Sequence, residues 1–350
     1  MKITSPSLLR AAAVLLCLLL TSACQGPNGN STAIAGSTAS DPLPSWAEGP
    51  TRSTILEFVA KVTEPGGMGY VPPEERIATF DNDGTLWCEQ PVVQIAFAMH
   101  RINAMAPEHP DWKDEQPFKS VLEGDEQYLV NDLMKGGHEL LKILALTHSG
   151  MPASEFEPLV KSFLKVVKHP RYGVPFTATT YLPMLELLEF LRASGFKTYL
   201  CSGGGVDFMR AFSEGTYGVV PENVIGSYAR NTFEEVHGKW VLIKGSADLF
   251  NNDKANKAVG IDQRIGRIPI LAAGNVRSGG DVGQLRYSQT NAHPSLQLMI
   301  NHDDAKREFA YAERGNESLN AARENGWVVV SMKRDWLRIF AHDAPAANKD

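Results

Sequence analysis

The stretch RIATFDNDGTLWCEQ runs from Arg76 to Gln90. Its apolar first half predicts a buried strand, which leads directly into two carboxylates, Asp81 and Asp83, and then into Gly84. Ligands of an open α/β sheet bind beyond the carboxyl ends of its strands, so acids at this point indicate a functional site. The alternative is a surface turn, because Asp-Gly pairs are common in turns.

Two later apolar runs, FKTYLCSGGG at 196–205 and IPILAAGN at 268–275, also end in glycine and polar residues. They add the following residues to the candidate site: Ser202, Gly203, Gly204, Gly274, Asn275 and, shortly afterwards, Asp281. A lysine, either Lys257 or Lys254, precedes the second of these runs. Lys257 is preferred, because a helical pattern begins immediately after it.

The chain alternates such apolar runs with amphipathic stretches, an order that predicts a parallel sheet with helices on both faces. We therefore predict an α/β fold with a doubly wound, Rossmann-like core over 51–90 and 175–350. Residues 91–174 are helical in pattern and predict an inserted cap, in which Ser154 and Glu157 have the spacing of a capping box. Residues 224–245 hold two extended runs around an HGK turn and predict a strand or a hairpin.

This set of residue types suits phosphoryl transfer. A carboxylate can attack phosphorus and form an aspartyl-phosphate, and a second acid can protonate the leaving oxygen. A divalent cation and a lysine can neutralise the anions that must meet, while hydroxyl and backbone N–H groups hold the phosphoryl oxygens.

The motifs resemble those of the haloacid dehalogenase superfamily, in its phosphoserine phosphatase-like branch. The Asp-x-Asp-x-Thr motif is matched by Asp81, Asp83 and Thr85, and the Ser-Gly-Gly motif begins at Ser202. The motif lysine is matched by Lys257. The fourth, acidic motif is matched in part by Gly274, Asn275 and Asp281, so that the resemblance extends from about 75 to 340.

The resemblance implies a role for each matched residue. Asp81 would be the nucleophile and a ligand of Mg²⁺, and Asp83 would be the general acid and base and would give its backbone carbonyl to the metal. Lys257 would stabilise charge. The phosphoryl group would be bound by Thr85, Ser202, Gly203 and Gly204. The metal set would be completed by Asn275 or by Asp281, because the fourth motif reads GNVRSGGD with an amide where aspartate is usual.

The family's serine-reading glutamate stands nine residues after the nucleophile, where this chain has Gln90, and Glu89 is one residue early. We therefore expect small phosphomonoesters in general as substrates, with a phosphoserine-specific phosphatase as the alternative. A phosphotransferase on the same fold would use the same aspartyl-phosphate, whereas a non-catalytic binding lipoprotein would keep only the fold. His302, Asp303 and Asp304 also follow an apolar run, and we interpret them as a polar loop.

The first 24 residues have the basic start, apolar middle and small-residue end of a secretory signal peptide. The sequence LTSAC ends at Cys24 and resembles a bacterial lipobox, in which that cysteine is lipidated. Residues 25–50 are rich in Gly, Ser, Pro and Thr and predict a flexible linker. We expect an exported protein of the cell envelope, periplasmic and bound to a membrane by its N-terminal lipid.

The 350 residues are 43% apolar and 21% charged and carry a net charge of −6, an ordinary composition for a globular protein. The acidic balance argues against a nucleic-acid partner, which would favour a basic excess. Besides Cys24 and Cys17 of the signal, the chain has Cys88 and Cys201. Export permits a disulfide between them, and two buried thiols are the expected alternative.

Overall fold

The computed structural model describes residues 41–125, 128–129, 131–132, 138–277 and 279–343. All of them belong to the compact unit that spans Asp41–Asp350. The predicted signal peptide, the lipidation site at Cys24 and most of the linker lie outside the described residues. Within the described residues, no helix combines the length and the apolar character needed to cross a membrane.

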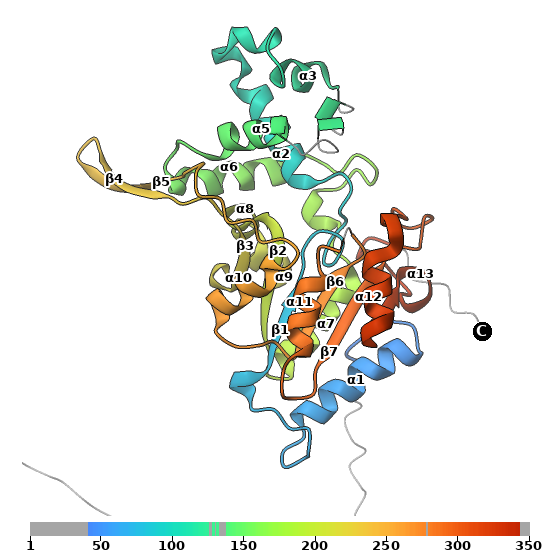
Figure 1. Cartoon of the computed structure of the whole chain (residues 1–350). Helices are drawn as coiled ribbons and strands as arrows, with labels where there is room; N and C mark the ends of the chain where they lie inside the picture. The colour runs from blue at the N-terminus through green and yellow to red at the C-terminus, as the bar shows by residue number, and fades with distance from the viewer. Residues whose placement is uncertain (1–40, 126–127, 130, 133–137, 278, 344–350) are drawn as a thin grey trace, which may run out of the picture. The chain divides into compact units, whose positions relative to one another are not determined.

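The central element is a six-stranded, wholly parallel sheet in the order β3-β2-β1-β6-β7-β8 (Figure 1). Its strands are β1 (Ile77–Phe80), β2 (Lys197–Gly205), β3 (Val224–Ser227), β6 (Leu271–Asn275), β7 (Leu296–Asn301) and β8 (Val328–Ser331). The chain runs outward from β1 in one direction through β2 and β3, and in the other through β6 to β8. The strand order therefore reverses between β1 and β6, the kind of point where open α/β sheets bind ligands.

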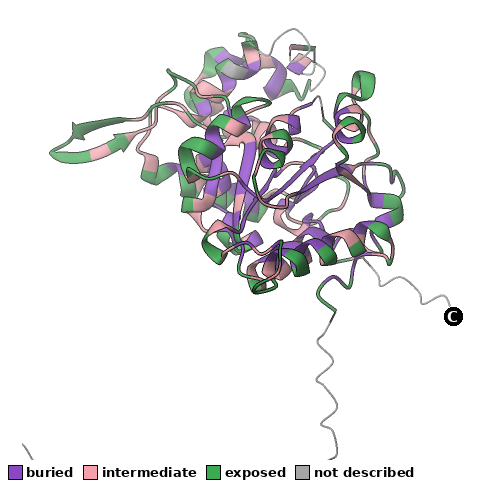
Figure 2. Cartoon of the chain, turned by 60° about the horizontal axis from the view of Figure 1, so that its bottom comes forward, coloured by how far each residue is buried: buried purple, intermediate pink, exposed green. Residues whose placement is uncertain are grey.

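Helices cover both faces of this sheet. They are α1 (Pro50–Thr63), α7 (Leu182–Ala193), α8 (Val206–Arg210), α9 (Ser213–Tyr217), α10 (Asn256–Ile265), α11 (Val282–Gln289), α12 (Glu317–Asn325) and α13 (Met332–Asp335). Successive residues of β6 enter different cores: Leu271 and Ala273 pack in the cluster with α1 and α7, and Ala272 in the cluster with α11 and α12. The strands are buried on both sides, as Figure 2 shows, which explains their continuous apolar runs and confirms the predicted doubly wound α/β fold.

The chain between β1 and α7 forms further helices, α2 (Val93–Met105), α3 (Phe118–Glu123), α5 (His138–His148) and α6 (Ala153–Val166), in the stretch where we predicted an inserted cap. Its own apolar cluster includes Ile102, Trp112 and Phe118. Phe97 of α2 joins the insertion to the core, because its ring lies 5.3 Å from that of Phe163 and 5.5 Å from that of Phe208 on α8.

The predicted capping box at Ser154 and Glu157 is wrong. Helix α6 begins at Ala153, directly after Pro152, and no side chain caps it. Proline fixes φ near the helical value, so Pro152 takes the N-cap position and the helix starts at Ala153. Ser154 is then already inside the first turn and cannot act as the N-cap.

Residues 232–243 form an antiparallel hairpin, β4 (Thr232–Val236) and β5 (Lys239–Ile243), as one of the two predicted forms. His237 and Gly238 have φ of 52° and 76°, the left-handed pair that a tight hairpin turn requires. The strands extend away from the sheet, and β4 is exposed along its whole length and β5 along most of it (Figures 1 and 2). The hairpin base joins the insertion, since Lys244 N donates to Met151 O at 2.9 Å.

Candidate active site

Strand β1 delivers Asp81 to the carboxyl edge of the sheet, at the reversal of strand order. Its backbone N–H donates to Ala273 O of β6 at 3.0 Å, which fixes the start of the loop. One oxygen of the buried carboxylate accepts a hydrogen bond of 2.6 Å from Lys257 Nζ. The other oxygen has no hydrogen-bond partner among the described residues, so it is available to a ligand.

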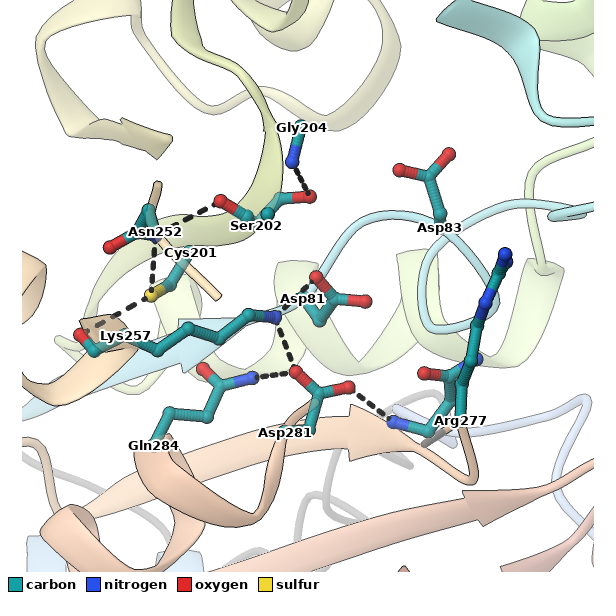
Figure 3. Close-up of polar contacts among 12 residues, drawn as sticks. Asp81, Asp83, Cys201, Ser202, Gly204, Asn252, Lys257, Arg277, Asp281 and Gln284 are labelled. Carbon is teal, nitrogen blue, oxygen red and sulfur yellow. Dashed lines mark hydrogen bonds and ion pairs between the residues drawn. The ribbon is translucent and has the colours of Figure 1, made fainter. Parts of the chain in front are cut away.

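Lys257 joins two carboxylates (Figure 3). Its ammonium group, buried in the first turn of α10, donates to Oδ1 of both Asp81 and Asp281. Lys254 is exposed and makes no such contact. The structure therefore places the preferred lysine, and not the alternative, in the site.

Asp281 holds Lys257 and the loop after β6 together. Its Oδ1 also accepts from Gln284 Nε2 at 2.8 Å, and its Oδ2 accepts from the backbone N–H of Asn275 at 2.8 Å. A Cβ at Gly274 would lie only 2.3 Å from that of Asp281, so glycine is required there. Both carboxylate oxygens of Asp281 are thus occupied within the protein.

Burial and the nearby Asp281 carboxylate raise the pKa of Asp81 to about 7, although Lys257 opposes the shift. Burial lowers the pKa of Lys257, but Asp281 and Asp81 outweigh burial and keep this pKa above its ordinary value. When both carboxylates are ionised they share one ammonium group, and a formal charge of −1 is then buried among them. A buried net charge is costly, so this cluster favours a bound cation.

Asp83 follows two residues later in the loop, where Trp87 Nε1 donates to its Oδ1 at 2.9 Å. Burial raises the pKa of Asp83, against the opposing effects of Trp87 and Arg277, and so helps this carboxyl to hold a proton. The next residue, Gly84, has φ of +75°, and a Cβ there would lie 2.0 Å from Asn275 Nδ2. Only glycine fits this turn.

The predicted phosphate-binding residues lie at the end of β2 and in the first loop. Ser202 is buried, and its Oγ accepts from Gly204 N at 3.1 Å. Gln94 of α2 accepts from Gly205 N at 2.9 Å and lies where a Cβ of Gly204 would be. The buried hydroxyl of Thr85 has no hydrogen-bond partner in the described part of the chain, which suits a group that awaits a ligand.

The described residues hold no group of three His, Cys, Asp or Glu side chains that could bind a metal ion. The resemblance assigns a metal set of another composition: a carboxylate oxygen of Asp81, the backbone carbonyl of Asp83 and the amide oxygen of Asn275. Asn275 Nδ2 donates to Tyr311 OH at 3.1 Å and to Glu89 Oε2 at 3.5 Å. These donors are all hard oxygens and suit Mg²⁺, but a single carboxylate supplies their charge.

Several site residues were missed in the sequence. Arg277 pairs with the buried Glu89, and Gln94 and Gln284 make the contacts above. Arg277 lies within the GNVRSGGD stretch, which was the available signal for it, whereas Gln94 and Gln284 stand in no motif.

His302 lies in the loop after β7, as interpreted, and it is buried there against the loop that holds Asp83. Its Nε2 lies 2.7 Å from Gly84 O, and its Nδ1 lies 3.1 Å from Oε2 of the buried Glu308. Its position at the end of β7 was the available signal. Asp303 and Asp304 do form a structural loop, in which they accept from Ser331 and Arg307 respectively.

The two remaining cysteines are buried free thiols, so the disulfide alternative does not form. Cys88 Sγ lies 3.0 Å from Glu308 Oε1, and Cys201 Sγ lies 3.6 Å from Asn252 Nδ2.

Part of the chain matches the model of a known protein family. Residues 75–240 match the family model of haloacid dehalogenase-like hydrolases. The curated proteins contain no match. A solved protein of unknown function from Anaerococcus prevotii is 17% identical over 79% of this chain and 90% of its own, with a TM-score of 0.50. At this identity the likeness shows the fold alone.

Two phosphatase-type structures have lower TM-scores. A phosphoserine phosphohydrolase-like protein from Francisella tularensis is 16% identical, over 74% of this chain and 95% of its own, with a TM-score of 0.40. A probable phosphoserine phosphatase from Vibrio cholerae is also 16% identical, over 77% and 67%, with a TM-score of 0.36. The family match agrees with the predicted family and with a hydrolase: residues 75–240 carry a haloacid dehalogenase-like hydrolase domain.

Proposed function

We propose that this hydrolase is an exported, Mg²⁺-dependent phosphomonoesterase that acts on small phosphate monoesters through an aspartyl-phosphate on Asp81. The observation that carries the proposal is the buried cluster of Asp81, Lys257 and Asp281 at the reversal of strand order. It holds a carboxylate with one free oxygen beside a fixed positive charge, as an in-line attack on phosphorus requires.

In the first step, the free oxygen of Asp81 attacks phosphorus and the bond from phosphorus to the ester oxygen breaks. Asp83 gives its proton to that oxygen, so the alcohol leaves neutral. In the second step, Asp83 takes a proton from water, which attacks the phosphoryl group and returns Asp81 as a carboxylate with free phosphate. Lys257 offsets charge on Asp81 throughout.

The phosphoryl oxygens would lie between Ser202, Thr85 and the backbone N–H groups of Gly203 and Gly204. The free hydroxyl of Thr85 is the support for this assignment, together with the buried position of Ser202 at the neighbouring strand end. Glycine at 203 and 204 lets the backbone approach the oxygens closely.

Asp81, the carbonyl of Asp83 and Asn275 would hold Mg²⁺, and when bound the ion would neutralise the phosphoryl oxygens and the excess charge of the cluster. Asp281 is better assigned as the partner of Lys257 than as a ligand, because its two oxygens already accept hydrogen bonds from Lys257, Gln284 and Asn275. A metal set with one charged ligand favours a weaker affinity for Mg²⁺ than a set with two.

Export and the membrane anchor rest on the N-terminal sequence. A positive start, an apolar run and a small-residue junction before Cys24 are the features of a lipoprotein signal. Replacement of Cys24 by serine should release the protein from the membrane fraction or block its maturation. Mass spectrometry that finds an unmodified N-terminus at another residue would refute the lipid anchor.

The proposal is tested by hydrolysis of p-nitrophenyl phosphate by the mature chain with Mg²⁺, after chelation, and after Mg²⁺ is restored. We expect activity that chelation abolishes and Mg²⁺ restores. Release of phosphate to an added alcohol in preference to water would instead favour the phosphotransferase. Complete inactivity of the Mg²⁺-loaded chain would favour the non-catalytic lipoprotein.

A further inference from the structure

Arg277 occupies the rim of the site on the side opposite Lys257. It lies two residues beyond Asn275 in the loop after β6, and its side chain is 45% exposed. In Figure 3, Lys257 approaches Asp81 from one side, and Arg277 extends on the other side toward the level of Asp83. The site therefore has a buried cation for the phosphoryl group and a second, accessible cation at its edge.

Glu89 holds Arg277 in this place. The Glu89 side chain is only 3% exposed, and it pairs with Arg277 Nη1. Its second oxygen lies 3.5 Å from Asn275 Nδ2. A carboxylate buried to this degree needs a charged partner, so the ion pair fixes the guanidinium at the rim. Glu89 is the acidic residue closest in sequence to the family's serine-reading position, but its carboxylate is paired with Arg277.

Arg277 also lies on the side where the leaving group must be. Asp83 is the proposed proton donor to the leaving oxygen, and Figure 3 shows the Arg277 side chain extending toward the level of the Asp83 carboxyl. A substituent on the leaving alcohol, one or two bonds beyond the ester oxygen, would therefore meet the guanidinium.

The guanidinium group has donors to spare. Of its five N–H groups, the described ion pair uses Nη1, and the other nitrogens have no partner in the described part of the chain. Planar N–H pairs of arginine match the two oxygens of a carboxylate. A leaving group with an ammonium would meet a cation here, and a neutral one would leave these donors to water.

We propose that Arg277 selects phosphate monoesters whose leaving group carries a carboxylate, which makes small phosphorylated hydroxy acids the preferred substrate class. The inference rests on the proposed function, because it takes Asp83 to mark the leaving-group side. It assigns Arg277 as a specificity-determining residue that binds the part of the substrate that departs.

The test uses three esters of similar size that differ in one charge: 2-phosphoglycolate, 2-hydroxyethyl phosphate and 2-aminoethyl phosphate. Their kcat/KM values are measured with Mg²⁺ for the wild-type chain and for Arg277→Gln, Arg277→Lys and Arg286→Gln. Arg286 is exposed on α11 and serves as the control for loss of one positive charge. p-Nitrophenyl phosphate is the reference substrate for all variants.

For the wild-type chain we expect kcat/KM to be highest for the ester with a carboxylate, lower for the hydroxyl and lowest for the ammonium. The carboxylate ester should exceed the hydroxyl ester by about tenfold or more, as suits a charge-assisted hydrogen bond. Arg277→Gln should bring this ratio to within about threefold of unity, mainly through KM, while Arg277→Lys should keep part of it and Arg286→Gln all of it. A wild-type ratio near unity, or a ratio that Arg277→Gln leaves unchanged, would overturn the inference.

A binding measurement separates this failure from failure of the proposed function. Titration calorimetry of 2-phosphoglycolate and 2-hydroxyethyl phosphate into Asp81→Asn, with and without Arg277→Gln, reports on recognition without turnover. If the wild-type chain proves inactive, a carboxylate preference in binding that depends on Arg277 still supports the inference, and its absence refutes it.

Discussion

The Lys257 side of the site is formed by Lys257, Asp281 and Gln284, whose side chains are all buried and bonded to one another. On the Arg277 side, formed by Arg277, Glu89 and Asn275, a loop residue and the entry to the helical insertion meet at a partly exposed rim. In the proposed mechanism the first side would neutralise charge at the reacting atoms, and the second would face the part of the substrate that varies. The chemistry and the selectivity of one site can therefore change separately.

The largest loss of activity should follow from a change of Asp81, which lies between the Lys257 side and the Arg277 side. Asp81→Asn removes the attacking oxygen while it keeps the size of the side chain. We expect kcat/KM for p-nitrophenyl phosphate to fall by about 10⁴-fold or more, as is usual when a nucleophile is lost. Asp114→Asn, the same change at an exposed position, is the control. Activity within tenfold of wild type, with deamidation excluded by mass spectrometry, would sink the mechanism.

The same substitution should stabilise the metal-free protein at alkaline pH, because the Lys257 side holds two anions and one cation. The pKa of Asp81 is about 7 in the folded protein, against an ordinary value of 3.8. Between these values the folded chain binds more protons than the unfolded chain, so stability falls as pH rises. Above pH 7 the penalty from Asp81 is on the order of 4 kcal/mol.

Unfolding by denaturant, with chelator present, at pH 5 and at pH 8 measures this effect. The wild-type free energy of unfolding should fall between these pH values by more than that of Asp81→Asn, which cannot ionise. Equal slopes for the two proteins would show that Lys257 fully compensates both carboxylates. The charge imbalance that distinguishes the Lys257 side from the paired Arg277 and Glu89 would then be absent.

A smaller effect is expected from His302, which supports the Asp83 loop beneath the Arg277 side. A carbonyl oxygen only accepts, so His302 Nε2 must donate to Gly84 O, at 2.7 Å. His302→Ala leaves that carbonyl and Oε2 of Glu308 buried without their histidine contacts. We expect kcat to fall about tenfold with little change in KM, and stability to fall by about 1–3 kcal/mol.

His302→Gln tests whether kcat falls because the loop that holds Asp83 is no longer fixed in place. The glutamine amide can still donate to Gly84 O and should recover part of kcat. His100→Gln, at an exposed histidine of α2, is the matched control. If His302→Ala keeps full kcat at a temperature where it is folded, the Gly84 contact has no part in placing Asp83.

Local patterns in the sequence were enough to predict the sheet and the position of Asp81, which depend on short apolar runs, and the choice of Lys257, which depends on the start of a helix. Glu89 meets Asn275 across 186 residues, and His302 meets Gly84 across 218. Such contacts depend on how distant loops fold over the site, and no local spacing encodes them. The capping box failed for a local reason instead, since Pro152 outweighed the spacing of Ser154 and Glu157.

The smallest effect is expected when the amide on the Arg277 side is replaced by aspartate, the residue usual at this place in the fourth motif. Asn275→Asp adds a charged oxygen ligand to a set in which Asp81 alone supplies charge. Affinity for hard cations rises with ligand charge, so the Mg²⁺ concentration for half-maximal activity should fall by about tenfold at most. The new carboxylate also faces Glu89, whose oxygen lies 3.5 Å from Asn275 Nδ2, and this repulsion should reduce the gain.

A double-mutant cycle with Glu89→Gln separates the gain from the added ligand charge from the repulsion by Glu89. The cycle is informative because residues 89 and 275 are in contact. The gain from Asn275→Asp should be larger when residue 89 is glutamine, and Tyr311 can keep its contact by donating its hydroxyl proton to the new carboxylate. Asn103→Asp, at an exposed asparagine of α2, controls for the added charge. If Asn275→Asp leaves the Mg²⁺ requirement unchanged in both backgrounds, then Asn275 is not a metal ligand. Its amide would then serve to hold Glu89, and through Glu89 the position of Arg277.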